Sequence, residues 1–295
     1  MAVQDRSPAQ AVADRVPAVA LVVAGTVSVQ FGAALAATLF DEIGPEGATL
    51  LRLLLSAAVL ALAWRPRVRG RSRADLRLVA AFGLTLGLMN FAFYEALDRI
   101  PLGAAVTIEF AGPVAVAVAL SHRRLDLVWV ALAAAGIVLL ADPFGAGGLD
   151  PVGLAFVLTA ATCWAGYILL AQRTAGRFRG GEGLALASLV AVLVPLGPGL
   201  AVGGTGLLHP HVLLLGFCVA VLCSVIPYSL ETEALRRMRA NVFGVLMSLE
   251  PVVAAIAGFV VLGQRLDAVD LFAMALVVGA SIGAMRTAGS VAPEA

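Results

Sequence analysis

Long runs of apolar residues dominate the chain, and short polar or Gly/Pro-containing breaks separate them. An α-helix rises 1.5 Å per residue, so about 20 apolar residues cross the roughly 30 Å hydrocarbon layer of a bilayer. The pattern therefore predicts ten membrane-spanning helices. They are expected at Val16–Phe40, Ala48–Trp64, Leu78–Leu97, Leu102–Leu120, Leu127–Ala141, Val152–Gln172, Leu184–Val202, Val212–Leu235, Asn241–Leu262 and Ala268–Met285.

The composition supports the same class. Of 295 residues, 61% are hydrophobic and 13% are charged, whereas soluble proteins carry about 25% charged residues. This excludes a disordered chain, a coiled coil and a soluble nucleic-acid binder. The breaks are mostly too short to hold a catalytic domain, so any chemistry must lie among the helices. We expect an all-α membrane protein whose partners are the lipid bilayer and a small molecule, with no nucleic acid; the sequence leaves the oligomeric state open.

The arginines predict how the helices are oriented. With the N-terminus inside, seventeen arginines fall on the cytoplasmic side and two, Arg99 and Arg265, on the other. Basic residues resist translocation, and short loops follow this bias. We therefore expect a multi-pass protein of the inner (cell) membrane with both termini in the cytoplasm.

An internal repeat relates the two parts of the chain. Leu97–Val114 aligns with Leu235–Val252, and Pro113 falls on Pro251. Because each half holds five helices, the halves enter the membrane from opposite sides, which is typical of transporters; a duplication kept only as a scaffold is the alternative. The expected divisions are a cytoplasmic tail 1–15, a first repeat 16–141, an external linker 142–151, a second repeat 152–285 and a cytoplasmic tail 286–295.

Three stretches carry a resemblance to a known family: Phe93–Val118, Cys163–Gln172 and Ile226–Leu266. Through them the sequence resembles the EamA family of the drug/metabolite transporter superfamily, and within it the threonine/homoserine exporters of the RhtA type. The resemblance covers essentially the whole chain. It implies a ten-helix exporter of small amino acids, coupled to protons and without a cofactor. Two positions depart from the family pattern: Gln264 stands where glutamate is usual, and Arg239 where proline is common.

Two carboxylates lie deep inside predicted helices. Glu109 is about 10 Å into the fourth segment and Glu250 about 13 Å into the ninth, at 1.5 Å per residue. A charge at that depth costs about 2.5–3.5 kcal/mol, so such residues are functional candidates. Each precedes a proline, and proline frees a carbonyl one turn earlier, where an ammonium group could bind. The alternative is that both are neutral packing groups.

Further polar and aromatic residues lie in other predicted helices, above all the third and the eighth, which occupy equivalent places in the two halves. Asn90 and Tyr94 are four residues apart, an interval that places side chains on one helix face. The predicted substrate-binding residues are Glu109, Glu250, Asn90, Tyr94, Trp164, Tyr228 and Glu231. Arg52 is a candidate partner for a substrate carboxylate, although it lies close enough to the headgroups to reach them instead. Glu231 could equally form an interfacial ion pair.

Energy coupling is assigned to protons because no nucleotide-binding pattern occurs in the chain. Burial disfavours the charged form of a carboxylate, so Glu250, and after it Glu109, is expected to carry the proton. Uniport down a steep gradient would need no such group.

The histidines, the cysteines and one helical ion pair are expected to have structural and not functional roles. No metal site is expected, because His209 and His211 are placed in an external loop with no nearby carboxylate or cysteine. The three cysteines are expected to pack as small apolar residues. Glu95 and Arg99 have the spacing of a helical ion pair.

Three alternatives to amino acid export stay open: export of drugs or other metabolites, a membrane enzyme acting on a lipid-linked substrate, and a passive channel or structural partner. The enzyme is disfavoured because the chain has no lysine, no H-E-x-x-H motif and no nucleophile beside a base.

Overall fold

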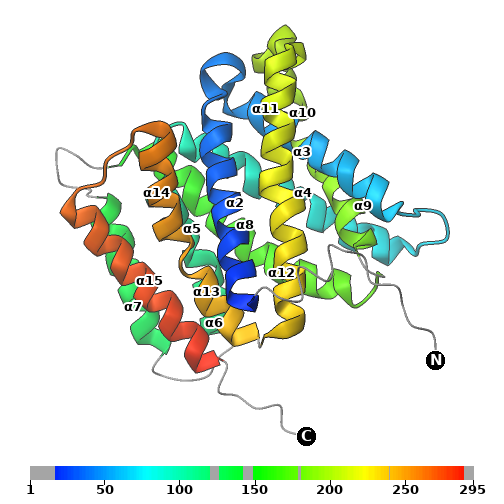
Figure 1. The fold of residues 1–295 in the computed structure, drawn as a ribbon. Coiled ribbons are helices and arrows are strands. Elements are labelled where there is room, and N and C mark those ends of the chain that lie inside the picture. The colour runs from blue at the N-terminus through cyan, green and yellow to red at the C-terminus, as the bar shows by residue number, and fades with distance from the viewer. Residues whose placement is uncertain (1–16, 120–125, 142–148, 179–180, 239, 289–295) are drawn as a thin grey trace, which may run out of the picture.

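The computed structural model describes residues 17–119, 126–141, 149–178, 181–238 and 240–288. All the regular secondary structure of these residues is helical (Figure 1). The α-helices are α2 (Ala18–Ala37), α3 (Phe40–Trp64), α4 (Arg73–Leu97), α5 (Leu102–Glu109), α6 (Ala111–Ala119), α7 (Asp126–Ala141), α8 (Pro151–Ala175), α9 (Glu182–Ala191), α10 (Leu193–Gly203), α11 (Pro210–Ala220), α12 (Ile226–Arg237), α13 (Ala240–Met247), α14 (Glu250–Leu262) and α15 (Ala268–Ala288). A 3₁₀-helix, η1 (Gly204–Leu208), and a π-helix, η2 (Val221–Val225), complete them.

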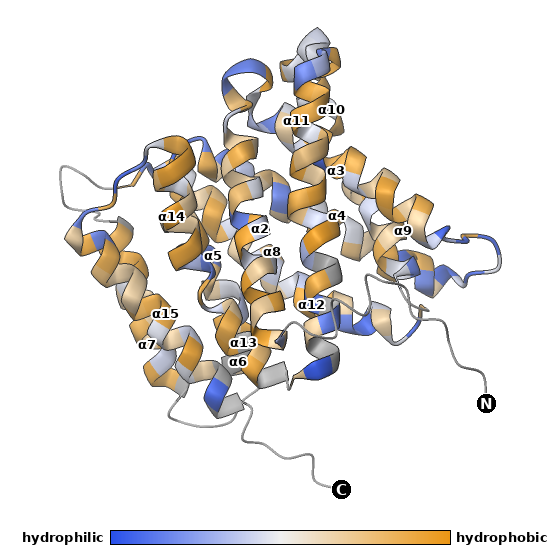
Figure 2. Ribbon diagram, in the orientation of Figure 1, coloured by the Kyte–Doolittle hydropathy of each residue, from blue (hydrophilic) through white to orange (hydrophobic). Residues whose placement is uncertain are grey.

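The outer surface of the helices is apolar, as a lipid-facing surface must be. In the described part of the chain, five helical stretches are long and apolar enough to cross a membrane, and the bent pair formed by α9 with α10–η1 makes a sixth. Large apolar side chains such as Phe259, Val260 and Phe272 are at least 60% exposed. Figure 2 shows that hydrophobic residues predominate along the helices. The structure is that of a multi-pass membrane protein.

Four of the predicted segments are not single α-helices. The fourth breaks just after Glu109, between α5 and α6, four residues before Pro113. The ninth breaks just before Glu250 and Pro251, between α13 and α14. The seventh bends by 41° between α9 and α10. In the eighth, Pro227 lacks the N–H that would bond a carbonyl one turn earlier, and the preceding turn widens into η2. Proline therefore accounts for most of these interruptions.

The helices pack in pairs that recur between the two halves. One group of contacts occurs twice: α2 of the first half packs on α12 and α14 of the second, and α8 of the second half packs on α4, α5 and α6 of the first. A further group of contacts joins equivalent helices of the two halves: α3 packs on α9 and α10, α5 packs on α14, and α7 packs on α15. Close approach of α4 to α9 depends on small residues: a Cβ on Gly83 or Gly87 would lie about 2.5 Å from a backbone oxygen or side chain of α9 and α10.

The bundle has two distinct ends (Figure 1). Helix α2 begins and α15 ends at one of them, which we call the terminal end. The α2–α3 turn, η1 and the start of α11 lie at the opposite end, which we call the far end. At the far end α3 is kinked at Gly44, whose φ of 68° suits glycine.

Candidate functional site

A cavity of about 490 Å³ lies at the centre of the bundle, between the two halves of the chain. Its lining comes from α2, the second halves of α3, α4 and α8, and residues of α5, α6, α9, η2, α12, α13 and α14. The described lining includes nothing from the α2–α3 turn or η1, so the cavity extends toward the terminal end. Its polar lining residues are Gln30, Arg52, Ser56, Asn90, Glu109, Ser188, Ser224, Glu231 and Glu250.

Glu109 and Glu250 reach this cavity from two helix breaks. Glu109 is the last residue of α5, and Pro113 cannot donate to its carbonyl. Carbonyl oxygens therefore gather beside Glu109, and the C-terminal end of a helix favours a positive group. Glu250 is the first residue of α14 and is 6% exposed. The Nε2 of Gln30 donates to its Oε2 over 3.4 Å.

Arg52 supplies the positive charge of the cavity. Its Nη1 donates to the hydroxyl of Tyr94 over 3.1 Å. Its Nε is buried and has no hydrogen-bond partner among the described residues. Glu109 lines the same cavity. The cavity thus holds a guanidinium with a free donor together with the carboxylates of Glu109, Glu231 and Glu250.

Aromatic and apolar side chains form the remaining wall. Trp164 lines the cavity and packs edge-on against Phe110, with ring centroids 5.0 Å apart and planes at 86°. Phe93, Phe243 and Met247 also line it. A small molecule in the cavity would therefore meet both charged groups and an apolar, aromatic surface.

The π-turn η2 and α12 add polar groups from the second half. Ser224 lies in η2, and its hydroxyl is hydrogen-bonded to that of Ser56 in α3 over 2.9 Å. Glu231 lies two turns further along and also lines the cavity. π-turns inside α-helices are frequent at functional sites. Tyr228 belongs to α12, but its side chain lies outside what the structure describes.

The predicted site residues are largely brought together. Glu109, Glu250, Asn90, Trp164, Glu231 and Arg52 all line the cavity. Tyr94 is not part of the lining; it is fully buried behind Arg52. Sequence reasoning missed Gln30 and Ser56. The sequence could have identified Gln30, because an amide side chain within an apolar segment needs a polar partner.

Several other predicted features have structural roles. Arg99 donates to Glu95 over 2.9 Å, as the spacing indicated. Glu233 pairs with Arg237 along α12. Cys163, Cys218 and Cys223 are free.

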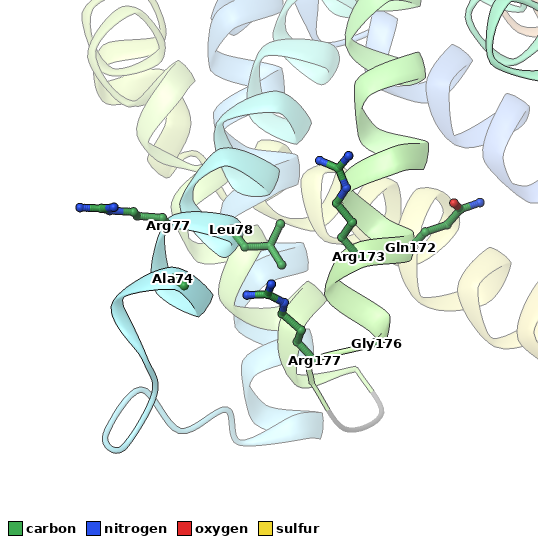
Figure 3. A pocket seen from close by; sticks show the side chains of 7 residues that line it. All are labelled: Ala74, Arg77, Leu78, Gln172, Arg173, Gly176 and Arg177. Carbon is green, nitrogen blue, oxygen red and sulfur yellow. The ribbon is translucent and has the colours of Figure 1, made fainter. Parts of the chain in front are cut away.

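A second hollow lies on the surface, between the start of α4 and the end of α8. Figure 3 shows its side chains, including Arg77, Arg173 and Arg177. All three arginines are exposed, and Arg177 pairs with Asp75 over 3.3 Å. Because it is open to the surroundings and lies outside the bundle, this hollow is not the candidate substrate site.

One prediction about the far end is wrong. His209 and His211 were expected to lack a nearby carboxylate, but Nε2 of His211 lies 2.7 Å from both carboxylate oxygens of Glu42. The first turn of α3 and the start of α11 meet at this point, a contact between residues far apart in sequence.

The fold and cavity define a membrane transporter, and comparisons with known proteins place it in a family. The model of the EamA-like transporter family matches residues 151–286. The threonine/homoserine exporter RhtA of Escherichia coli (strain K12) is 42% identical over 274 residues, 92% of each chain. The exporter of the same name from Salmonella typhimurium (strain LT2) is 41% identical over 263 residues, 88% of each chain. The chain belongs to the EamA-like transporter family.

A solved crystal structure shares the fold. It covers 92% of this chain and 98% of its own, with a TM-score of 0.60 and 20% identity. Membership of a transporter family also sets aside the membrane enzyme considered from the sequence.

Proposed function

We propose that this protein exports small amino acids of the threonine/homoserine type from the cytoplasm through its central cavity. The observation that carries the proposal is that Arg52 and buried carboxylates line the same cavity, within a chain 42% identical to an exporter of these amino acids. A zwitterion carries one charge of each sign, and the cavity offers a partner for both.

The binding mode follows from the placement of the charges. Arg52 binds the substrate carboxylate through its free Nε, because a guanidinium can hold a carboxylate by two parallel hydrogen bonds. Glu109 and Glu250 receive the ammonium group, helped by the carbonyls at the end of α5. Asn90, Tyr228 and Glu231 complete the polar contacts. Trp164 faces the substrate side chain, and Tyr94 positions Arg52.

The ten crossings are proposed as two inverted five-helix repeats, residues 16–141 and 152–285. The recurring helix pairs support this, because exchanging the halves maps the α2–α12 contact onto the α8–α4 contact. The helix breaks support it too: Glu109, which ends α5, aligns with Met247, which ends α13. The arginine bias places both tails, 1–15 and 286–295, in the cytoplasm and the linker 142–151 outside.

Reporter fusions test this topology. A reporter joined after Gly148 should report the outside and one joined after Arg177 the cytoplasm. The same side for both would overturn the inverted repeat.

The proposed orientation makes the terminal end cytoplasmic, so the cavity opens inward and the far end is closed. Inverted repeats allow one packing to be realised in two symmetry-related ways. Export would alternate between this inward-open form and an outward-open form in which the far end separates. Glu250, with Glu109, would release a proton inward as the ammonium group binds, which couples export to the proton gradient.

Growth of cells under toxic amino acid stress tests the substrate class. Cells lacking their own exporters and producing this chain should survive added threonine or homoserine, and Arg52→Gln should not support survival at equal membrane abundance. Protection against cationic drugs without protection against either amino acid would favour the rival drug exporter, for which the apolar wall around Trp164 is suited.

A further inference from the structure

At the far end of the bundle, three metal-binding side chains converge from distant parts of the chain. Glu42 lies in the first turn of α3, and His209 and His211 flank Pro210 at the start of α11. Their ligand atoms all lie within 4.8 Å of one another. The two imidazole rings are 5.8 Å apart at 31°. All three side chains are exposed.

Packed backbone holds these side chains in place. Pro210 fixes the first residue of α11 between the two histidines, and the N–H of His209 donates to the carbonyl of Gly206 over 3.0 Å. Gly206 in turn packs closely on Ile43, beside Glu42: an added Cβ would lie 3.2 Å from it. The cluster therefore sits on two ordered elements in contact.

We propose that Glu42, His209 and His211 bind a divalent transition-metal ion of the zinc type. Imidazole nitrogen and carboxylate oxygen are ligands that zinc accepts at about 2.0–2.2 Å, so bound donors lie within about 4 Å of one another and small side-chain rotations from the observed positions suffice. Three protein ligands leave a fourth position for water. Calcium and magnesium prefer sites made wholly of oxygen ligands.

The position of the site gives it a consequence for transport. Glu42 belongs to the first half and the histidines to the second, so a bound ion ties α3 to α11 across the end that must separate for release to the outside. This step rests on the proposed function and its orientation. Bound metal holds the protein in the form whose cavity opens toward the terminal end, and so slows export.

Binding is tested first, without transport. Purified full-length protein, treated with a chelator and titrated with zinc by calorimetry, should bind one ion per chain, with magnesium and calcium binding far more weakly. Glu42→Gln, His209→Ala and His211→Ala should each weaken zinc binding by about tenfold or more, since even ligand-orienting residues cost that much. The control variants His122→Ala and Asp41→Asn should bind as the unmodified chain does. Absence of saturable zinc binding, or equal affinity in the three ligand variants, would overturn the site.

Transport measurements then test whether a bound ion, by tying α3 to α11, slows export. Zinc added outside should slow threonine efflux by the unmodified chain, and the slowing should disappear in His209→Ala while His122→Ala keeps it. If zinc binds but leaves efflux unchanged, the proposed effect of the metal on transport would be overturned. Zinc binding in a protein that moves no amino acid would refute the proposed function and leave the metal site standing.

Discussion

Arg52 donates a hydrogen bond to the hydroxyl of Tyr94 over 3.1 Å, and its guanidinium carbon lies 5.3 Å from the centre of the Tyr94 ring. Tyr94 is fully buried, so it fixes one side of the guanidinium from behind the cavity. The buried Nε of Arg52 is left without a partner among the described residues. An unsatisfied buried donor costs about 1–3 kcal/mol, and a substrate carboxylate would remove that cost.

Arg52 and Tyr94 should therefore respond differently to substitution. Arg52→Lys keeps the charge but loses the planar fork, and loss of a charge-assisted hydrogen bond of about 1.5–3 kcal/mol should raise KM for threonine about tenfold or more. Tyr94→Phe keeps the ring and should raise KM by only a few-fold. Efflux measured over a range of internal threonine concentrations gives both values. An unchanged KM in Arg52→Lys would remove Arg52 from the substrate site.

The two cavity carboxylates should be needed for transport and not for folding. Glu109→Gln and Glu250→Gln keep shape and hydrogen-bonding capacity while deleting the charge, so efflux should fall severely at normal membrane abundance. The matched control is Glu233→Gln, whose carboxylate pairs with Arg237 on α12 and is not part of the cavity lining. Full efflux by both cavity variants would leave them as packing groups.

The pH dependence should depend on Glu250. Protons entering from outside would load the carboxylate, and substrate arriving from the cytoplasm would displace them, so an outside-acid gradient should accelerate efflux. In Glu250→Gln the acceleration should vanish. Vesicles loaded with threonine and diluted into buffers of different pH provide the measurement. Efflux that ignores the imposed gradient in the unmodified chain would refute proton exchange.

Close packing of α4 on α9 makes a prediction about stability. A Cβ on Gly87 would lie 2.5 Å from the carbonyl oxygen of Ala191, so Gly87→Leu should force the helices apart and cost about 1–3 kcal/mol, as overpacking does. Gly197→Leu is the control, because nothing lies within 4 Å of its added Cβ. Thermal unfolding in detergent should show a lower midpoint for the first variant alone; equal midpoints would contradict the packing.

Much of this architecture could be predicted from local sequence. Apolar runs located the helical segments, although α3 begins at Phe40, eight residues before the predicted Ala48, and four segments are broken or bent. Depth along a segment identified Glu109 and Glu250, which both line the cavity. Pro113 and Pro251 pointed to irregular helices, since proline removes a helical donor. These inferences need only neighbouring residues.

Contacts between distant segments could not be predicted in the same way. The interval between Asn90 and Tyr94 correctly gave one helix face, but only the packing of α3 against α4 decides that Asn90 lines the cavity and Tyr94 does not. The meeting of Glu42 with His211 likewise depends on the contact of α3 with α11. The missed Gln30 shows a further limit: its partner, Glu250, lies on a helix from the other half.

The central claim is that this protein moves small amino acids through the cavity that contains Arg52, Glu109 and Glu250. The most direct measurement is the flux of labelled threonine out of liposomes containing the purified protein. The account predicts a saturable flux that excess homoserine inhibits. It also predicts that Glu250→Gln, although folded, loses most of this flux. Flux of threonine no faster than from protein-free liposomes, with correctly folded protein present, would contradict it.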